Sequence, residues 1–193
     1  MNLTKKEHLS SLRQSIREAK ATGDNAQLNA LTQVLSFWKE KSSVLQLAAL
    51  LTPLYDRVIH FFVADAFAHA KDATVVPLLL AAARAPENIN YRATFIWPCI
   101  KYDCTEYLDF FIDFLLQYDD PDEATLACVY VIKAMKGPFE PKQVKASITA
   151  LLQRNSNLTT HDLALQDEVF TVQAAYALLD KYFAQIDSKW KDS

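Results

Sequence analysis

The chain has 193 residues, 51% of them hydrophobic, and carries a formal net charge of −3 at pH 7. This length suits one domain with a continuous core, and the negative charge argues against the basic footprint of a nucleic-acid-binding protein. Only two glycines occur, Gly23 and Gly137, which excludes folds rich in tight turns or phosphate-binding loops. Alanine and leucine dominate without strand-type alternation, so we expect a single all-α domain.

Two amphipathic helices are predicted within residues 1–41. The first begins at Thr4, whose spacing to Glu7 is that of a capping box, and it ends near Gly23. Asp24 starts the second helix by the same capping logic. Because the connection is short, the two helices should pair as an antiparallel hairpin. Their polar outer faces indicate a cap on one end of the domain.

From about Ser43 onward the predicted helices become apolar on more than one face. They cover residues 44–51, 54–70 and 75–85. Helices of this kind are sandwiched between neighbours. Pro53 and Pro77 suit first-turn positions, whereas Pro98 lies inside a helical pattern and is predicted to kink that helix rather than end it.

An internal repeat appears as three apolar triplets, 36 residues apart. The triplets are Leu78–Leu80, Phe114–Leu116 and Ala150–Leu152. Each follows an amphipathic helix and precedes a polar turn. A period of this length, made of helix pairs, predicts an α-solenoid in which neighbouring hairpins bury each other's apolar faces. We expect these hairpins to cover residues 43–185.

The stretch 115–135, LLQYDDPDEATLACVYVIKAM, places an acidic turn at Asp120–Asp122 between an apolar helix end and an alanine-rich helix. It resembles the junction within a HEAT repeat. The resemblance extends loosely over residues 53–185 and implies a HEAT-like α-α superhelix of stacked antiparallel hairpins.

A narrower resemblance lies in residues 91–117. Arg92, Thr94 and the turn Tyr102–Cys104 are similar to a segment of small HEAT-like immunity proteins from bacterial toxin systems. That resemblance implies a protein that binds and neutralises a cognate toxin.

Two Asp/His pairs and three cysteines are the candidates for catalysis or metal binding. Asp56 and Asp65 each precede a histidine by four residues, His60 and His69. Nine residues separate the two pairs, which places them on opposite faces of a helix. They cannot hold one metal ion, and we interpret them as local hydrogen bonds.

The cysteines are Cys99, Cys104 and Cys128, and they form no CxxC pair. We expect buried free thiols in a reducing compartment rather than a disulfide or zinc framework. The apolar neighbours of Cys128 should raise its pKa rather than activate it. No catalytic residue, cofactor or metal site is therefore predicted.

Location is predicted from two further features. The lysine-rich amino terminus has no apolar segment typical of a signal peptide, and the longest apolar runs are too short to cross a bilayer. These features predict a cytoplasmic protein without a membrane partner. HEAT-like solenoids also include DNA glycosylases, but Trp38, Trp97 and Trp190 lack the surrounding Lys and Arg that phosphate contact requires. Trp97 is interpreted as a packing residue.

The main electrostatic feature lies between Lys101 and Lys133, where eight acidic residues occur and no basic one. Three of them share one face of a predicted helix over residues 105–117. They are Glu106, Asp109 and Asp113, which we call the acidic stripe. Lys142 and Lys145 occupy a comparable face of the next hairpin.

Two interpretations of the acidic stripe stay open. Either the stripe and the two lysines satisfy each other across the gap, or the stripe lines a groove for a basic partner. In the second case its aromatic anchors would be Tyr102, Tyr107 and Tyr118. The predicted function is a non-enzymatic protein-binding module, most specifically a toxin-neutralising immunity protein. The alternatives are a general HEAT-like scaffold and a nucleic-acid-directed enzyme such as a DNA glycosylase.

Overall fold

The computed structural model describes residues 5–24, 57–117, 123–154 and 170–191. Every regular element in these ranges is a helix, so the all-α class is confirmed. The α-helices are α1 (Lys5–Thr22), α4 (Arg57–His69), α5 (Val76–Arg84), α6 (Arg92–Ile96), α7 (Leu108–Gln117), α8 (Glu123–Ala134), α9 (Pro141–Arg154) and α11 (Phe170–Lys191). Short 3-10 helices connect them: η2 (Ala73–Val75), η3 (Pro86–Asn88), η4 (Trp97–Lys101) and η5 (Thr105–Tyr107).

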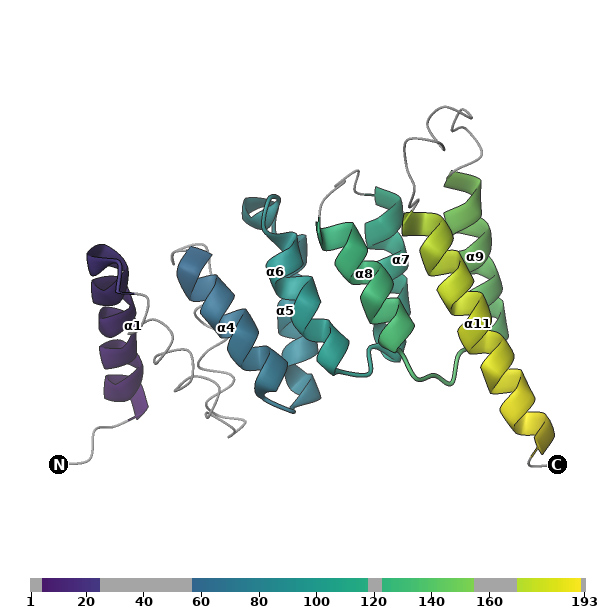
Figure 1. Ribbon diagram of the computed structural model, residues 1–193, viewed down its shortest axis with the longest axis horizontal. Coiled ribbons are helices and arrows are strands. Elements are labelled where there is room, and N and C mark those ends of the chain that lie inside the picture. Colours follow the sequence, from purple (N-terminus) through teal and green to yellow (C-terminus); the bar gives the residue numbers. More distant parts are fainter. Residues whose placement is uncertain (1–4, 25–56, 118–122, 155–169, 192–193) are drawn as a thin grey trace.

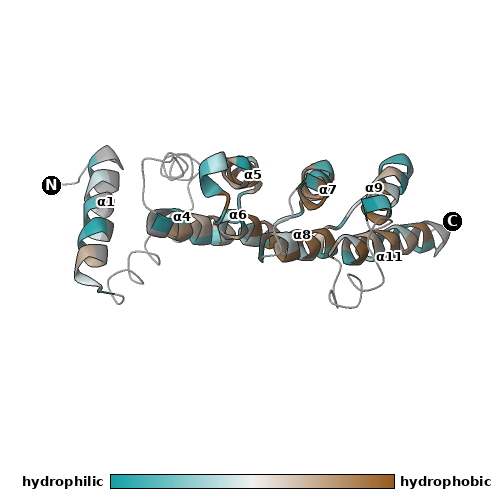
Figure 2. Cartoon of the chain, turned by 90° about the horizontal axis from the view of Figure 1, so that it is seen from above, coloured by the Kyte–Doolittle hydropathy of each residue, from teal (hydrophilic) through white to brown (hydrophobic). Residues whose placement is uncertain are grey.

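The helices form two rows (Figure 1). The first row consists of α4, α6 with η4, α8 and α11, and the second row of α5, α7 and α9, as Figure 2 shows from above. The chain passes from the first row to the second within each pair, so the paired helices run in opposite directions. The three apolar triplets of the predicted repeat all lie in the second row, one each in α5, α7 and α9. The repeat therefore marks successive helices of one row.

One continuous apolar core runs between the rows. Its largest fully buried side chains are the phenylalanines of α4, α6 and α7, namely Phe67, Phe95, Phe111 and Phe114. The helices of the first row carry buried residues on nearly all sides, as α8 shows with Cys128, Val129 and Val131. The two-sided hydrophobicity predicted from residue 43 onward is thus explained, for the described helices, by neighbours on both flanks and the second row behind.

Helix α1 ends where the sequence predicted. Gly23 adopts a φ of +67°, and the backbone amide of Asp24 donates a hydrogen bond of 2.9 Å to the carbonyl of Ala19. This bond and the left-handed glycine are features of the Schellman termination. The predicted cap at Thr4, the second helix of the amino-terminal hairpin, the helix over 44–51 and Pro53 lie outside the described residues.

Helical conformation continues across Pro98, but its hydrogen-bond ladder changes. Helix α6 ends at Ile96, and the chain proceeds directly into η4, with Trp97 still at φ −53° and ψ −43°. Proline has no N–H to donate to the carbonyl four residues earlier, so the α-helical ladder cannot persist there. The prediction that Pro98 would kink the helix rather than end it is thus confirmed only in part: no extended loop opens at Pro98, but the α-helix ends at Ile96 and continues as a 3-10 helix. Similarly, the helix predicted over 105–117 begins as η5 before α7.

The turns from α4 to α5 and from η4 to α7, which lead from the first row to the second row, share one construction. Asp72 accepts hydrogen bonds on Oδ1 from the backbone amide of Thr74, at 3.0 Å, and from its hydroxyl, at 2.7 Å. In the next hairpin, Asp103 Oδ1 accepts hydrogen bonds from the amide of Thr105, at 3.1 Å, and from its hydroxyl, at 2.5 Å. An Asp side chain that bonds two residues ahead closes such a turn and starts the following helix.

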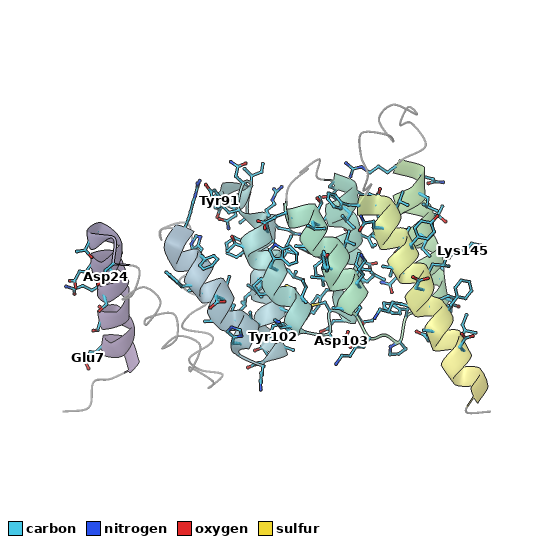
Figure 3. All side chains as sticks on the ribbon, in the orientation of Figure 1. Glu7, Asp24, Tyr91, Tyr102, Asp103 and Lys145 are labelled. Atoms are coloured by element: carbon cyan, nitrogen blue, oxygen red, sulfur yellow. The ribbon has the colours of Figure 1, made fainter. Side chains whose placement is uncertain are left out.

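The second of these turns also binds its neighbours. The backbone amide of Lys136 donates to Asp103 Oδ1 at 3.3 Å, and the amide of Gly137 donates to Thr105 Oγ1 at 3.0 Å. On the other side, the buried hydroxyl of Tyr102 donates to the carbonyl of Phe67 at the end of α4. Figure 3 shows Tyr102 and Asp103 at the lower end of the rows. Residues 102–105 therefore join three successive hairpins.

The side chains of Tyr102 and Asp103 both have pKa values that differ from their ordinary values. Burial raises the pKa of Tyr102 to about 12, and the charge of Asp72 adds to the effect. Partial burial alone would raise the pKa of Asp103, but hydrogen bonds from the Thr105 hydroxyl and from the amides of Lys136 and Thr105 outweigh it. The pKa of Asp103 consequently lies below its ordinary value.

We expect Asp103→Ala to lower the free energy of unfolding by about 1–2 kcal/mol, because it removes the acceptor for three protein donors. Urea denaturation followed by circular dichroism measures the change. Glu106→Ala, three residues further on at an exposed position, is the matched control and should change stability little. Equal losses in the two variants would contradict this role for Asp103.

The charge of Asp103 predicts a pH dependence. Because its folded pKa is depressed, the folded state binds fewer protons than the unfolded state there. Its contribution is therefore complete above the unfolded pKa of about 4 and is lost as the pH falls through the folded pKa. The stability difference between the native protein and Asp103→Asn should shrink below about pH 4. A constant difference from pH 7 downward would refute the charge effect.

Tyr102→Phe should destabilise the fold by about 0.5–1.5 kcal/mol, the net value of one hydrogen bond. The Phe67 carbonyl loses the tyrosine hydroxyl and keeps the backbone amide of Ala70 as a donor. Tyr176→Phe is the control, since Tyr176 is 62% exposed and water can replace its hydroxyl contacts. Thermal unfolding of both variants compares them directly. A Tyr102→Phe protein as stable as the control would show that the hydroxyl contributes nothing.

Candidate binding surfaces

The acidic stripe lies on the outer side of the second row. Glu106 in η5, and Asp109 and Asp113 in α7, are all exposed. The opposite side of α7 is packed into the core through residues that include Leu108, Phe111, Ile112 and Leu115. The predicted division of this helix into a charged face and a buried face is therefore confirmed.

The stripe is partly engaged by its neighbours in the row. Asp113 lies 4.0 Å from the guanidinium of Arg84 on α5, with both side chains more than half exposed, so the pair contributes little to stability. Asp109 accepts a hydrogen bond of 2.9 Å from the Gln143 side chain on α9. Across the described residues, neither Lys142 nor Lys145 (Figure 3) forms an ion pair with the stripe. The neighbours act through Arg84 and Gln143 instead.

The tyrosines predicted as aromatic anchors can be assessed at two of their three positions. Tyr102 is only 9% exposed and holds the Phe67 carbonyl, so it is a structural residue and the prediction of a contact role for it is wrong. Tyr107 is partly buried and packs against the core; burial and then the Glu106 carboxylate raise its pKa. Tyr118 lies outside the described residues.

A shallow acidic hollow of about 450 Å³ lies at one end of the stripe. It is formed where η5 meets the loop that leads into α9, and its carboxylates are Asp103, Glu106 and Glu140. Asp103 is committed to the turn described above. The remaining two carboxylates favour a basic side chain over an anion.

Of the two Asp/His pairs, only that of Asp65 and His69 lies wholly within the described residues. Its separation is longer than a hydrogen bond, so the predicted local hydrogen bond is not found there. His60 is buried, with its ring centre 5.9 Å from that of Phe95. His69 is exposed, and its Nε2 lies 3.9 Å from Asp65 on the same helix. The two imidazoles thus have different surroundings, while Asp56 is outside the described residues. Within the described segments, no group of three His, Cys, Asp or Glu residues is placed to hold a metal ion.

The three cysteines are buried and free of disulfide bonds. Burial raises the pKa of the Cys128 thiol well above its ordinary value, as predicted from its apolar neighbours. A hydrogen bond with Cys104, followed by burial, raises the pKa of Cys99 in the same direction. A raised thiol pKa lowers the fraction of reactive thiolate.

A second surface was not predicted from the sequence. Three aromatic side chains stand on successive helices of the first row: half-buried Trp97 on η4, and exposed Tyr130 on α8 and Tyr176 on α11. We call these three residues the aromatic row. The Trp97 and Tyr130 rings are 5.6 Å apart, and Tyr130 and Tyr176 are 46% and 62% exposed. Exposed aromatic side chains that gather on one surface mark interaction sites.

Trp97 serves both the core and this row. It packs against the core, as predicted, but its indole also contacts the ring of Tyr130. On α8, Tyr130 and Lys133 are exposed on a narrow strip that begins at exposed Glu123, and most other residues of the helix are buried. An aromatic residue on the narrow exposed side of an apolar helix is the signal that could have located the row.

Neither the protein-family models, nor the curated proteins, nor the solved structures include a match to this chain. Among the helices that the structure describes, none is long and apolar enough to cross a membrane.

We expect the three thiols to be unreactive in the native protein. Their burial and the raised pKa of Cys99 and Cys128 both oppose thiolate formation. A disulfide reagent such as DTNB should label them only after denaturant unfolds the chain. Rapid labelling of Cys128 in native buffer would contradict its assigned core position; Cys128→Ala identifies which signal belongs to it.

Proposed function

We propose that this chain is a HEAT-like, non-enzymatic protein-binding module that uses the aromatic row as its principal contact surface. The single observation that carries the proposal is the occurrence of Trp97, Tyr130 and Tyr176 on successive helices of the first row. The rings of Trp97 and Tyr130 are in contact, and Lys133, which lies beside Tyr130, lines one hollow with Tyr176. Tyrosine and tryptophan are enriched among the few residues that carry most of the binding energy of protein interfaces, because they bury large areas with few rotatable bonds.

The packing of the helices that carry the aromatic row favours the same function. Helix α8, which carries Tyr130, is buried against both neighbours and the second row. The contact residues therefore project from packed helices rather than from loops. A partner that covers them would bind to a preorganised surface, so little conformational entropy is lost on association.

The most specific form of this proposal is an immunity protein that neutralises a cognate bacterial toxin in the cytoplasm. It is supported by the resemblance of residues 91–117. Within that segment, Arg92 is buried 5.7 Å from the centre of the Phe114 ring, and Tyr102 and Asp103 tie hairpins together. These residues maintain the scaffold, so the resemblance bears on the fold of the segment more than on its contacts.

The acidic stripe is a second candidate contact surface, for a partner with basic groups. It faces outward from the second row, whereas the aromatic row faces outward from the first. Glu106 and Glu140 at the acidic hollow extend the negative charge beyond α7. Electrostatic attraction there would mainly raise the association rate and would weaken with added salt.

Partner capture with matched variants tests the proposal. Three proteins are immobilised on a resin and exposed to a lysate of the organism that encodes the chain. They are the native protein, a Tyr130→Ala, Tyr176→Ala double variant, and the control Leu152→Ala, which changes an exposed apolar residue of the second row. We expect the native protein and Leu152→Ala to retain the same partner. The double variant should bind it at least about thirtyfold more weakly, as for loss of hot-spot residues.

The result that would overturn the proposal is a partner retained equally by all three proteins, or no partner above a blank resin. For the immunity form, each protein encoded beside this gene is co-expressed with the chain, and one of them is expected to be toxic when expressed alone. We expect host cells to survive when they co-express the native chain and to die when they co-express the double variant. An Asp109→Asn, Asp113→Asn variant in the same assays measures what the acidic stripe contributes.

A further inference from the structure

A hollow between α8 and α11 lies next to the aromatic row. Its volume is about 410 Å³. Its lining residues are Lys133 from α8 and Gln173, Tyr176, Ala177, Asp180 and Lys181 from α11. The exposed ring of Tyr176 belongs to both the hollow and the row, so a partner that covers the row would also enter the hollow.

The charges in this hollow do not cancel. Two lysines face one carboxylate, and in the part of the chain that the structure describes none of the three forms an ion pair within 4.0 Å. The Lys133 amine instead lies 5.2 Å from the centre of the Tyr130 ring, where the π-face attracts it. The hollow therefore combines a net positive charge with aromatic and alanine surface.

We propose that the hollow between α8 and α11 binds an acidic peptide segment of a partner protein, with carboxylates against Lys133 and Lys181 and an apolar side chain against Tyr176. This inference rests on the proposed binding function of the aromatic row and adds the chemistry of the partner. A peptide fits better than a nucleic acid, because two lysines beside Asp180 supply too little positive charge to follow a phosphate backbone.

Dimensions also favour a peptide. Neighbouring packed helices lie about 8–10 Å apart, which about three residues of extended chain span at about 3.3 Å each. A segment that crosses from α8 to α11 can thus place a carboxylate at Lys133 and another near Lys181. Asp180 would repel the incoming carboxylates, so it limits the affinity of the hollow.

The probe is a fluorescein-labelled synthetic peptide of repeated Glu-Asp-Phe-Leu units, with binding followed by fluorescence anisotropy. Two further probes separate the sources of affinity: the neutral Gln-Asn-Phe-Leu analogue and a labelled oligothymidylate. We expect saturable binding of the acidic peptide that weakens with salt. Its neutral analogue and the oligonucleotide should bind more weakly.

Matched variants locate the site. Lys133→Gln with Lys181→Gln should weaken binding of the acidic peptide about tenfold, the effect of two partly exposed ion pairs. Lys142→Gln with Lys145→Gln removes the same charge from α9 in the second row and should leave binding unchanged. Asp180→Asn should tighten binding, because it removes the opposing carboxylate. Circular dichroism confirms that each variant is folded.

Several results would overturn this inference: no saturable binding, tighter binding of the neutral peptide or of oligothymidylate, or equal losses from the two lysine pairs. The proposed function is tested separately by the captured partner. If Tyr130→Ala with Tyr176→Ala releases that partner while Lys133→Gln with Lys181→Gln does not, the binding module stands and the acidic segment is wrong.

Discussion

Hydrogen bonds from three successive hairpins converge on the turn formed by residues 102–105. Tyr102 holds the last turn of α4, Asp103 closes its own turn, and both Asp103 and Thr105 accept amides from the loop after α8. Helix rows packed only by apolar contacts could slide, because such contacts have little directionality. Directional bonds at the row ends set the register in which α7 meets α8 and α9, and the exposed surfaces depend on that register.

The two rows consequently present different chemistry on their outer sides. In the second row, α7 has only one buried side, and its exposed side carries the acidic stripe. In the first row, α8 is buried on all but a narrow strip, and that strip holds Tyr130 and Lys133. A helix confined in this way can place few residues toward solvent. An aromatic ring in one of these positions, beside Trp97 and Tyr176, therefore indicates recognition more strongly than on an ordinary amphipathic helix.

The buried polar chemistry of the chain serves the scaffold. The thiols of Cys99 and Cys128 have raised pKa values within the core, and His60 packs against Phe95. Asp103, an exposed residue whose pKa is lowered, likewise accepts hydrogen bonds from three donors of the turn and the next loop. These groups support the two outer surfaces, where a partner would bind.

Local patterns in the sequence determined the helical class, the stop at Gly23, the burial of the cysteines and the outward face of the acidic stripe. Each of these depends on periodicity or on a residue's own conformational preference, which short stretches of chain express. Tertiary packing alone decided which aromatic residues face solvent. Tyr102 is buried because the carbonyl of Phe67 lies beside it, and Tyr130 is exposed because the neighbours of α8 leave that strip uncovered. Contacts between residues as distant in sequence as Trp97 and Tyr130 arise only when the hairpins stack, so no local pattern contains them.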